Sequence, residues 1–120
     1  EYMFAKYNNT PEPQDELLTF IVAGAGFTGI EFIGELSERL PQLCAHYDVP
    51  KDNVKMYVIE AAPSALPGFD PELVEYAMNL LESRGVEFKI NCPIKEVTES
   101  GVTLASGDEI KAGTVVWATG

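Results

Sequence analysis

A glycine-rich turn between an apolar run and an amphipathic run is the feature of this sequence that most restricts its fold. The stretch Thr19–Glu31 reads T-F-I-V-A-G-A-G-F-T-G-I-E. Gly24 suits a tight turn, Gly26 lets a phosphate approach the backbone, and Gly29 lets the following helix lie close to its strand. A helix that begins near Phe27 would point unpaired amides and the positive end of its dipole at an anion. The stretch therefore predicts a strand–turn–helix unit that holds the pyrophosphate of a dinucleotide, and a tight turn in another kind of α/β protein is the alternative.

The surrounding sequence alternates between strand and helix patterns. Apolar or alternating runs at Leu17–Ala23, Val54–Ile59 and Val86–Ile90 predict three strands. Apolar residues at three- and four-residue spacing predict helices over Phe27–Tyr47 and from Pro71 to Arg84. Strand, helix and strand in this order favour parallel pairing through right-handed crossovers. The expected fold class is α/β, with a Rossmann-like parallel sheet and helices.

Two positions predict how the helices are shaped and bounded. Pro41 should kink or restart the first helix, because proline lacks an amide hydrogen and clashes with the preceding turn. Asp70 should cap the second helix, and Gly85 should end it in a left-handed conformation.

The last third of the chain changes to short segments separated by turns. Ile94–Thr98, Val102–Ala105 and Glu109–Lys111 predict a three-stranded antiparallel β-meander. Thr114–Trp117 predicts a buried strand that returns to lie beside the first strand, and Trp117 is expected in the core.

The first residues predict a short helical turn followed by a linker, because Pro11 and Pro13 disfavour regular structure. We therefore expect residues 1–16 to lead into a single dinucleotide-binding domain over residues 17–120. The chain starts with Glu1 and not with Met, which suggests a piece of a longer protein.

Charge and cysteine content exclude several function classes. A net charge of −11 opposes nucleic acids and anionic lipids, so no nucleic acid and no direct membrane contact are expected. Cys44 and Cys92 stand far apart, which predicts packing and neither a redox dithiol nor a metal site. Two unpaired thiols suit a cytoplasmic location. His46 is expected at the surface, without catalytic function.

An acid at the end of the second strand predicts which nucleotide binds. Glu60 follows Ile59 directly, where such acids accept hydrogen bonds from the adenosine ribose and repel the extra phosphate of NADP. The stretch Ala61–Phe69 contains no Lys or Arg to clamp that phosphate. We therefore expect NAD(H), with Glu60 and Ala61 at the site; a solvated strand end is the alternative for Glu60.

Four segments together resemble type II NADH dehydrogenases. They are G-A-G-F-T-G-I-E at Gly24–Glu31, G-E-L at Gly34–Leu36, V-I-E-A-A-P with L-P-G-F-D at Val58–Asp70, and V-V-W-A-T-G at Val115–Gly120. The resemblance implies an NADH domain inserted in a larger FAD domain, in an enzyme that passes hydride from NADH to FAD and electrons to quinone. It implies a peripheral enzyme on the cytoplasmic face of the membrane, with FAD held only by the longer protein. Without that FAD domain, the chain alone should bind NAD(H) with no turnover and no catalytic residue of its own.

The resemblance also implies further cofactor contacts. Ala118, Thr119 and Gly120 would approach the cofactor cleft. Glu31 would lie near the nicotinamide and the flavin edge, although a plain helix-dipole role is an equal alternative. Independently of the resemblance, the helix start predicts that the amides of Phe27 and Thr28 face the pyrophosphate, and a role only in starting the helix is the alternative.

Two other functions stay open. One is the NADH domain of a flavoprotein disulfide or ferredoxin reductase, which shares this architecture. The other is a free-standing module that senses NAD without chemistry.

Overall fold

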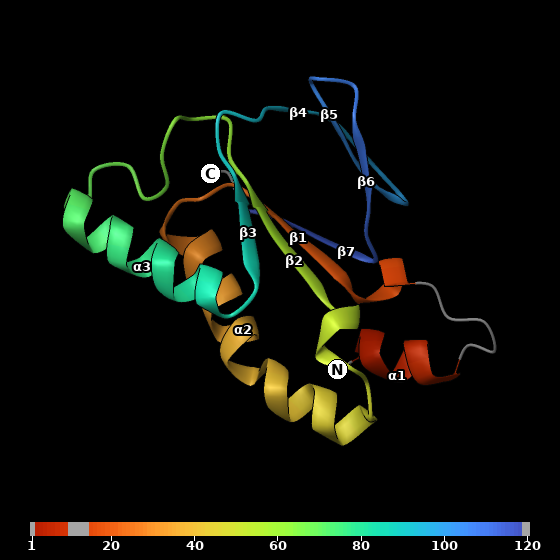
Figure 1. Cartoon of the computed structure of the whole chain (residues 1–120). Coiled ribbons are helices and arrows are strands. Elements are labelled where there is room, and N and C mark those ends of the chain that lie inside the picture. Colours follow the sequence, from red (N-terminus) through yellow and green to blue (C-terminus); the bar gives the residue numbers. More distant parts are fainter. Residues whose placement is uncertain (1, 10–14, 119–120) are drawn as a thin grey trace.

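The computed structural model describes residues 2–9 and 15–118 (Figure 1). Four parallel strands form the main sheet in the order β3-β2-β1-β7. They are β1 (Thr19–Ala23), β2 (Lys55–Ile59), β3 (Val86–Lys89) and β7 (Thr114–Trp117). The predicted parallel sheet, with the last strand beside the first, is confirmed.

The strand β1 lies between two partners, and its five residues are all buried. A strand covered on both faces favours apolar residues, which explains the apolar run Phe20–Ala23 after the buried Thr19. Ala23 pairs with Ile59 on one side and with Trp117 on the other. The carboxyl ends of three strands therefore meet at one edge of the sheet, where the glycine turn begins.

Two helices cover one face of the sheet (Figure 1). Helix α2 (Phe27–Tyr47) runs through Pro41, so the restart that was one of the two predicted outcomes is wrong, and the kink stays a prediction. Helix α3 (Pro71–Ser83) is capped by Asp70, whose side chain accepts a hydrogen bond of 2.8 Å from the Glu72 amide. Gly85 follows with a φ of 98°, as the predicted left-handed helix end requires.

The N-terminal segment is packed against the domain. Helix α1 (Tyr2–Asn9) buries Phe4 to 1% exposure, and the Phe4 ring lies 6.3 Å from Phe20 and 5.8 Å from Tyr47. The domain boundary at residue 17 stays a prediction, but this packing favours counting α1 with the domain. Short 3-10 turns at Asp15–Leu18 (η1) and Lys51–Asn53 (η2) lead into β1 and β2.

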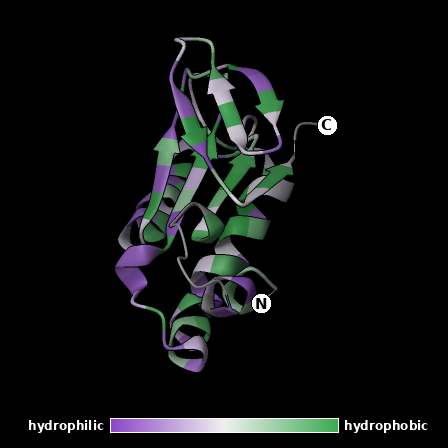
Figure 2. Ribbon diagram, turned by 90° about the vertical axis from the view of Figure 1, so that its right-hand side faces the viewer, coloured by the Kyte–Doolittle hydropathy of each residue, from purple (hydrophilic) through white to green (hydrophobic). Residues whose placement is uncertain are grey.

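The opposite face of the main sheet is covered by a separate antiparallel sheet of three strands (Figure 1). These are β4 (Ile94–Thr98), β5 (Gly101–Leu104) and β6 (Glu109–Lys111), in sequence order. Val102 and Leu104 pack there on Ile21 and Ile59. Figure 2 shows the hydrophobic residues concentrated in the central strands, between the two covering layers. The predicted meander is confirmed, with its middle strand starting at Gly101.

Trp117 corrects one prediction. Trp117 is 59% exposed at the end of β7, which is an edge strand of the main sheet. Cys44 is buried in the helix-side core, as expected, and Cys92 is half-buried. Among the helices of residues 2–9 and 15–118, none is long and apolar enough to cross a membrane.

Candidate nucleotide site

The glycine turn starts with a residue whose backbone only glycine adopts easily. Gly24 has a φ of 116°, and its amide donates a hydrogen bond of 2.8 Å to the carbonyl of Ile59. The turn is thereby fastened to the end of β2 as it leaves β1.

Gly29 is required by close packing. A Cβ atom at this position would lie 2.3 Å from the carbonyl oxygen of Gly24 and 3.0 Å from a methyl group of Val22. It would also come within 3.3 Å of the Cβ of Ala118. The first turn of α2 can therefore approach β1 and β7 only because Gly29 has no side chain.

Gly26 has a different role, because nothing lies within 4 Å of the Cβ that it lacks. It is the N-cap of α2, and it offers no side chain to cap the first amides. Amides in a first helical turn have no intrahelical partner. Phe27 and Thr28 follow, and both residues are exposed.

Glu60 joins the glycine turn to the loop after β2. Its two carboxylate oxygens accept hydrogen bonds from the amides of Ala25 at 2.7 Å and Ala62 at 2.9 Å. A carboxylate offers about four lone-pair positions. The side chain is half-buried, and two positions remain for other donors. Sequence reasoning found Glu60 but not this contact, because it depends on tertiary approach over 35 residues.

The loop after Glu60 is held against the turn at two more points. The Leu66 amide donates a hydrogen bond of 2.8 Å to the carbonyl of Ala25, and Leu66 has a φ of 48°. The rings of Phe27 and Phe69 stack with centroids 6.3 Å apart and planes 9° from parallel. The loop thus forms a fixed rim beside the N-terminus of α2.

A cavity of about 230 Å³ lies where the strand ends meet. Its lining combines residues from the ends of β1, β2 and β7 with the start of the meander: Ala23, Gly24, Ile59, Glu60, Ala61, Cys92, Pro93, Ile94 and Trp117. The structure therefore brings together Gly24, Glu60 and Ala61, which were predicted site residues. It adds Cys92 and Trp117, which the sequence had assigned to packing.

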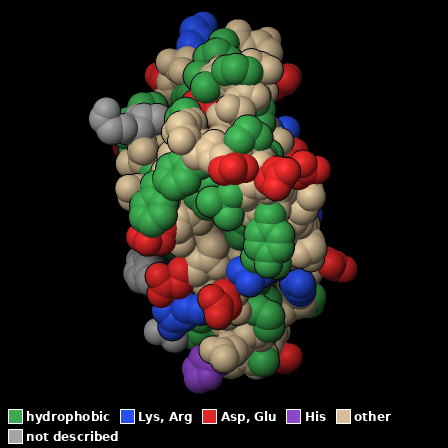
Figure 3. Space-filling model, turned by 90° about the vertical axis from the view of Figure 1, so that its left-hand side faces the viewer, with side chains coloured by type: hydrophobic (Ala, Val, Ile, Leu, Met, Phe, Trp, Pro, Cys, Tyr) green, Lys and Arg blue, Asp and Glu red, His purple; other side chains and the backbone are tan. Residues whose placement is uncertain are grey.

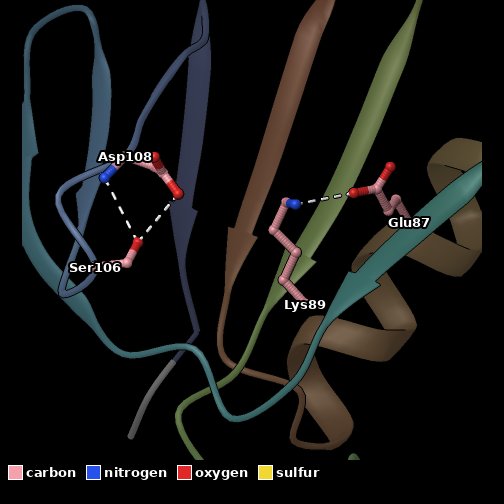
Figure 4. A network of polar contacts seen from close by, with 4 residues as sticks. All are labelled: Glu87, Lys89, Ser106 and Asp108. Carbon is pink, nitrogen blue, oxygen red and sulfur yellow. Dashed lines mark hydrogen bonds and ion pairs between the residues drawn. The ribbon is translucent and has the colours of Figure 1, made fainter.

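A lysine beside the end of β2 has its charge compensated (Figure 4). Lys89 pairs with Ile59 across the strands, and its ammonium lies 3.0 Å from a Glu87 carboxylate oxygen and 5.7 Å from the centre of the Tyr57 ring. The hydrogen bond to Glu87 raises the pKa of Lys89. Figure 4 shows this pair on the sheet and the Ser106–Asp108 pair on the meander turn.

Glu31 lies apart from that cavity. It lines a groove of about 560 Å³ between α2 and α3, together with Glu35 and Tyr76. Figure 3 shows apolar and acidic side chains side by side on this face of the molecule. Glu31 is beyond the first turn of α2, which contains no acid, so the helix-dipole alternative loses support.

The remaining predicted residues are of two kinds. Ala118 is half-buried and adjoins Gly29, with its amide 2.8 Å from the Ala23 carbonyl oxygen. Thr119 and Gly120 lie outside the described residues. The described part of the chain holds no group of three or more His, Cys, Asp or Glu side chains that could hold a metal ion.

A parallel sheet, a glycine turn into a closely packed helix, and an acid at the end of β2 define a Rossmann-like α/β domain. The chain belongs to the pyridine nucleotide-disulphide oxidoreductase family, whose sequence profile matches residues 3–120.

Relatives within this family are similar over the whole chain. The chain is 50% identical to a type II NADH:quinone oxidoreductase of Staphylococcus haemolyticus and 48% identical to one of Staphylococcus aureus. Each alignment covers 100% of this chain and 31% of the relative. The chain thus spans about a third of the length of the curated relatives that it matches.

Solved structures share the fold. NDH2 from Plasmodium falciparum, solved in complex with NADH, has a TM-score of 0.88 and 18% identity, over 99% of this chain and 26% of that one. A ferredoxin reductase from Rhodopseudomonas palustris has a TM-score of 0.68 and 22% identity, over 85% of this chain and 24% of that one. Both therefore support the Rossmann-like architecture.

Proposed function

We propose that this chain is the NAD(H)-binding domain of an FAD-dependent NADH:quinone oxidoreductase of type II. Gly24, Gly26 and the amides of Phe27 and Thr28 would hold the pyrophosphate. Glu60, with Ala61 beside it, would accept the adenosine ribose hydroxyls. Ala118, Thr119 and Gly120 would complete the cleft at the other end.

The observation that carries this proposal is the position of Glu60 relative to the glycine turn. Its carboxylate lies 2.7 Å from the Ala25 amide, so the ribose acceptor and the phosphate cradle are held as one unit. The amides of Ala25 and Ala62 already donate to the Glu60 carboxylate, and the two adjacent hydroxyl groups of a ribose would supply two further donors. NAD(H) fits this donor and acceptor set, whereas a 2′-phosphate would meet a second negative charge.

The net charge of −11 makes local donors essential. Open amides at the N-terminus of α2 and the helix dipole stabilise an anion within one turn of the helix. The pyrophosphate would therefore be bound by backbone and not by lysine or arginine. Binding by backbone amides would therefore be compatible with the net negative charge of the chain.

In the proposed reaction NADH gives hydride to FAD, and the reduced flavin supplies electrons to quinone. FAD and quinone would both be held by parts of the longer protein outside this chain. The residues here bind NADH, orient its nicotinamide and exclude water from the cleft, with no catalytic residue of their own. The enzyme would work as a peripheral protein on the cytoplasmic face of the membrane.

Calorimetric titration of the chain with NADH and with NADPH tests the proposal. Binding of NADH, clearly stronger than that of NADPH, is the expected result. Preference for NADPH, or no binding of either, would contradict it. Purified chain mixed with NADH and a quinone should give no oxidation above background.

The reductase alternative has the weaker support. The ferredoxin reductase aligns over less of this chain than NDH2 does, although both likenesses concern the fold alone. If the longer protein reduces quinone faster than ferredoxin or a disulfide, it is the NADH:quinone oxidoreductase and not the reductase. If the longer protein shows no turnover at all, the NAD-sensing module is favoured.

A further inference from the structure

We propose that the indole of Trp117 is a wall of the nucleotide cleft and stacks on the nicotinamide ring of bound NAD(H). This inference rests on the proposed function and assigns a residue to the nicotinamide half of the ligand.

Trp117 is an exposed aromatic residue at the end of β7, the edge strand of the main sheet. It is 59% exposed, while the preceding residues of β7 are half-buried. It is also the single tryptophan of the chain. Large amphipathic rings at such positions commonly contact a ligand or partner.

The cavity lining points to a ligand. Trp117 lines the same cavity of about 230 Å³ as Gly24 and Glu60. Among the described residues, none of the other large cavities is lined by the glycine turn, by Glu60 and by an aromatic ring together. A bound molecule that reaches both Gly24 and Glu60 would therefore pass close to the indole.

Strand order decides which half of the ligand that is. Glu60 follows β2 and Trp117 ends β7, on opposite sides of the central strand β1. With the adenosine ribose at Glu60 and the pyrophosphate at the turn that follows β1, the other half of the dinucleotide falls on the β7 side. That half carries the nicotinamide.

The alternation of side chains along the end of β7 sets the direction of the ring. Ala118 lies 3.3 Å from the position of a Cβ on Gly29, on the side covered by α2. Trp117 precedes it and lines the cavity together with Cys92 and Ile94, on the meander side. The indole therefore lines the cavity from the meander side, and 59% of the residue is exposed.

The chemistry suits a pyridine ring. The face of an indole is electron-rich and attracts a cationic or electron-poor ring, in offset stacking or as a cation–π contact. The pyridinium of NAD⁺ is both flat and positive. Stacking would hold it without any charged side chain, which is consistent with a cavity whose only acid is Glu60.

Fluorescence of Trp117 during titration with NAD⁺ and with ADP-ribose tests the inference. NAD⁺ does not absorb in the emission band of tryptophan, so quenching requires close contact with the pyridinium. ADP-ribose has the same adenosine, pyrophosphate and second ribose but lacks the pyridine ring. We expect strong quenching by NAD⁺ and little by ADP-ribose.

Three variants sharpen the test by calorimetry. Trp117→Ala should weaken NAD⁺ binding about threefold to tenfold and leave ADP-ribose within about twofold. Trp117→Phe should retain most of the affinity. Tyr76→Ala removes another exposed aromatic ring, on α3, and should change neither ligand.

The outcomes separate this inference from the proposed function. If NAD⁺ binds without quenching and with the same affinity in Trp117→Ala, the indole contact is wrong but the NAD(H)-binding function stands. That result would favour a role of Trp117 in an interface with the rest of the longer protein. Equal weakening of NAD⁺ and ADP-ribose would place the ring elsewhere and also overturn it. If the wild-type chain binds neither ligand, both the function and the contact are wrong.

Discussion

The Glu60 carboxylate accepts a hydrogen bond of 2.7 Å from the Ala25 amide, which ties the end of β2 to the glycine turn after β1. Its other oxygen accepts from the Ala62 amide at 2.9 Å. One acid thus joins the glycine turn to the loop after β2. A substitution there should change both folding and nucleotide selectivity.

Replacing Glu60 by Ala should lower the free energy of unfolding by about 2 kcal/mol, because charge-assisted hydrogen bonds to two amides are lost. It should also weaken NADH more than NADPH, because the repulsion of a 2′-phosphate disappears with the ribose acceptor. Urea unfolding and calorimetry measure the two effects. Glu96→Ala, at an exposed acid of β4, is the matched control. Equal losses for NADH and NADPH would refute the ribose assignment.

Gly29→Ala and Gly26→Ala should separate packing from ligand approach. At Gly29 the new Cβ would lie 2.3 Å from the Gly24 carbonyl oxygen, so we expect a loss of about 2–3 kcal/mol in unfolding free energy.

At Gly26 the same methyl group meets no protein atom, and the φ of −76° is one that alanine adopts. Stability should stay within about 1 kcal/mol, while NADH affinity falls because the methyl group occupies the phosphate approach. Thermal unfolding paired with calorimetry checks both variants. Unchanged NADH binding in folded Gly26→Ala would contradict the cradle.

Phe4→Ala tests whether α1 belongs to the domain. The ring is buried to 1% exposure against Phe20 and Tyr47, so its removal should cost about 3–5 kcal/mol. Leu73→Ala, at a residue 53% exposed on α3, should cost less than about 0.5 kcal/mol. Denaturant midpoints report both values. If Phe4→Ala proves as mild as Leu73→Ala, α1 is only a lead-in segment.

The two cysteines should differ in reactivity. Burial raises the pKa of the Cys44 thiol, an effect that Lys51 partly opposes. Iodoacetamide should therefore modify half-buried Cys92 first and Cys44 only slowly, as mass spectrometry of timed samples can show.

The same pKa shift has a consequence for stability. The native state holds the Cys44 proton more tightly than the unfolded chain, so the contribution to stability is complete below the ordinary thiol pKa of 9.0 and is lost as pH rises through the raised value. Urea unfolding between pH 8 and pH 10 should show this decline, and Cys44→Ala should reduce it. A decline of the same size in Cys44→Ala would assign it to other groups.

Much of the architecture was predictable because it depends on local patterns. The apolar run of β1, the Asp70 cap and the left-handed Gly85 each follow from the conformational preferences of a few adjacent residues. Pro41 is the exception, since helix α2 runs through it. Packing of a long amphipathic helix on the sheet outweighs the loss of one hydrogen bond there.

The sequence by itself determined the order of strands and helices, the glycines at which backbone must come close, and the acid that follows β2. These properties depend on residue type and on spacing along the chain. Only the tertiary structure decided what lies across the sheet edge: that Glu60 contacts Ala25, that Glu31 lies in another groove, and that Trp117 lines the cavity with Gly24. These relationships join residues tens of positions apart, and their geometry depends on strand pairing and side-chain direction that no local pattern encodes.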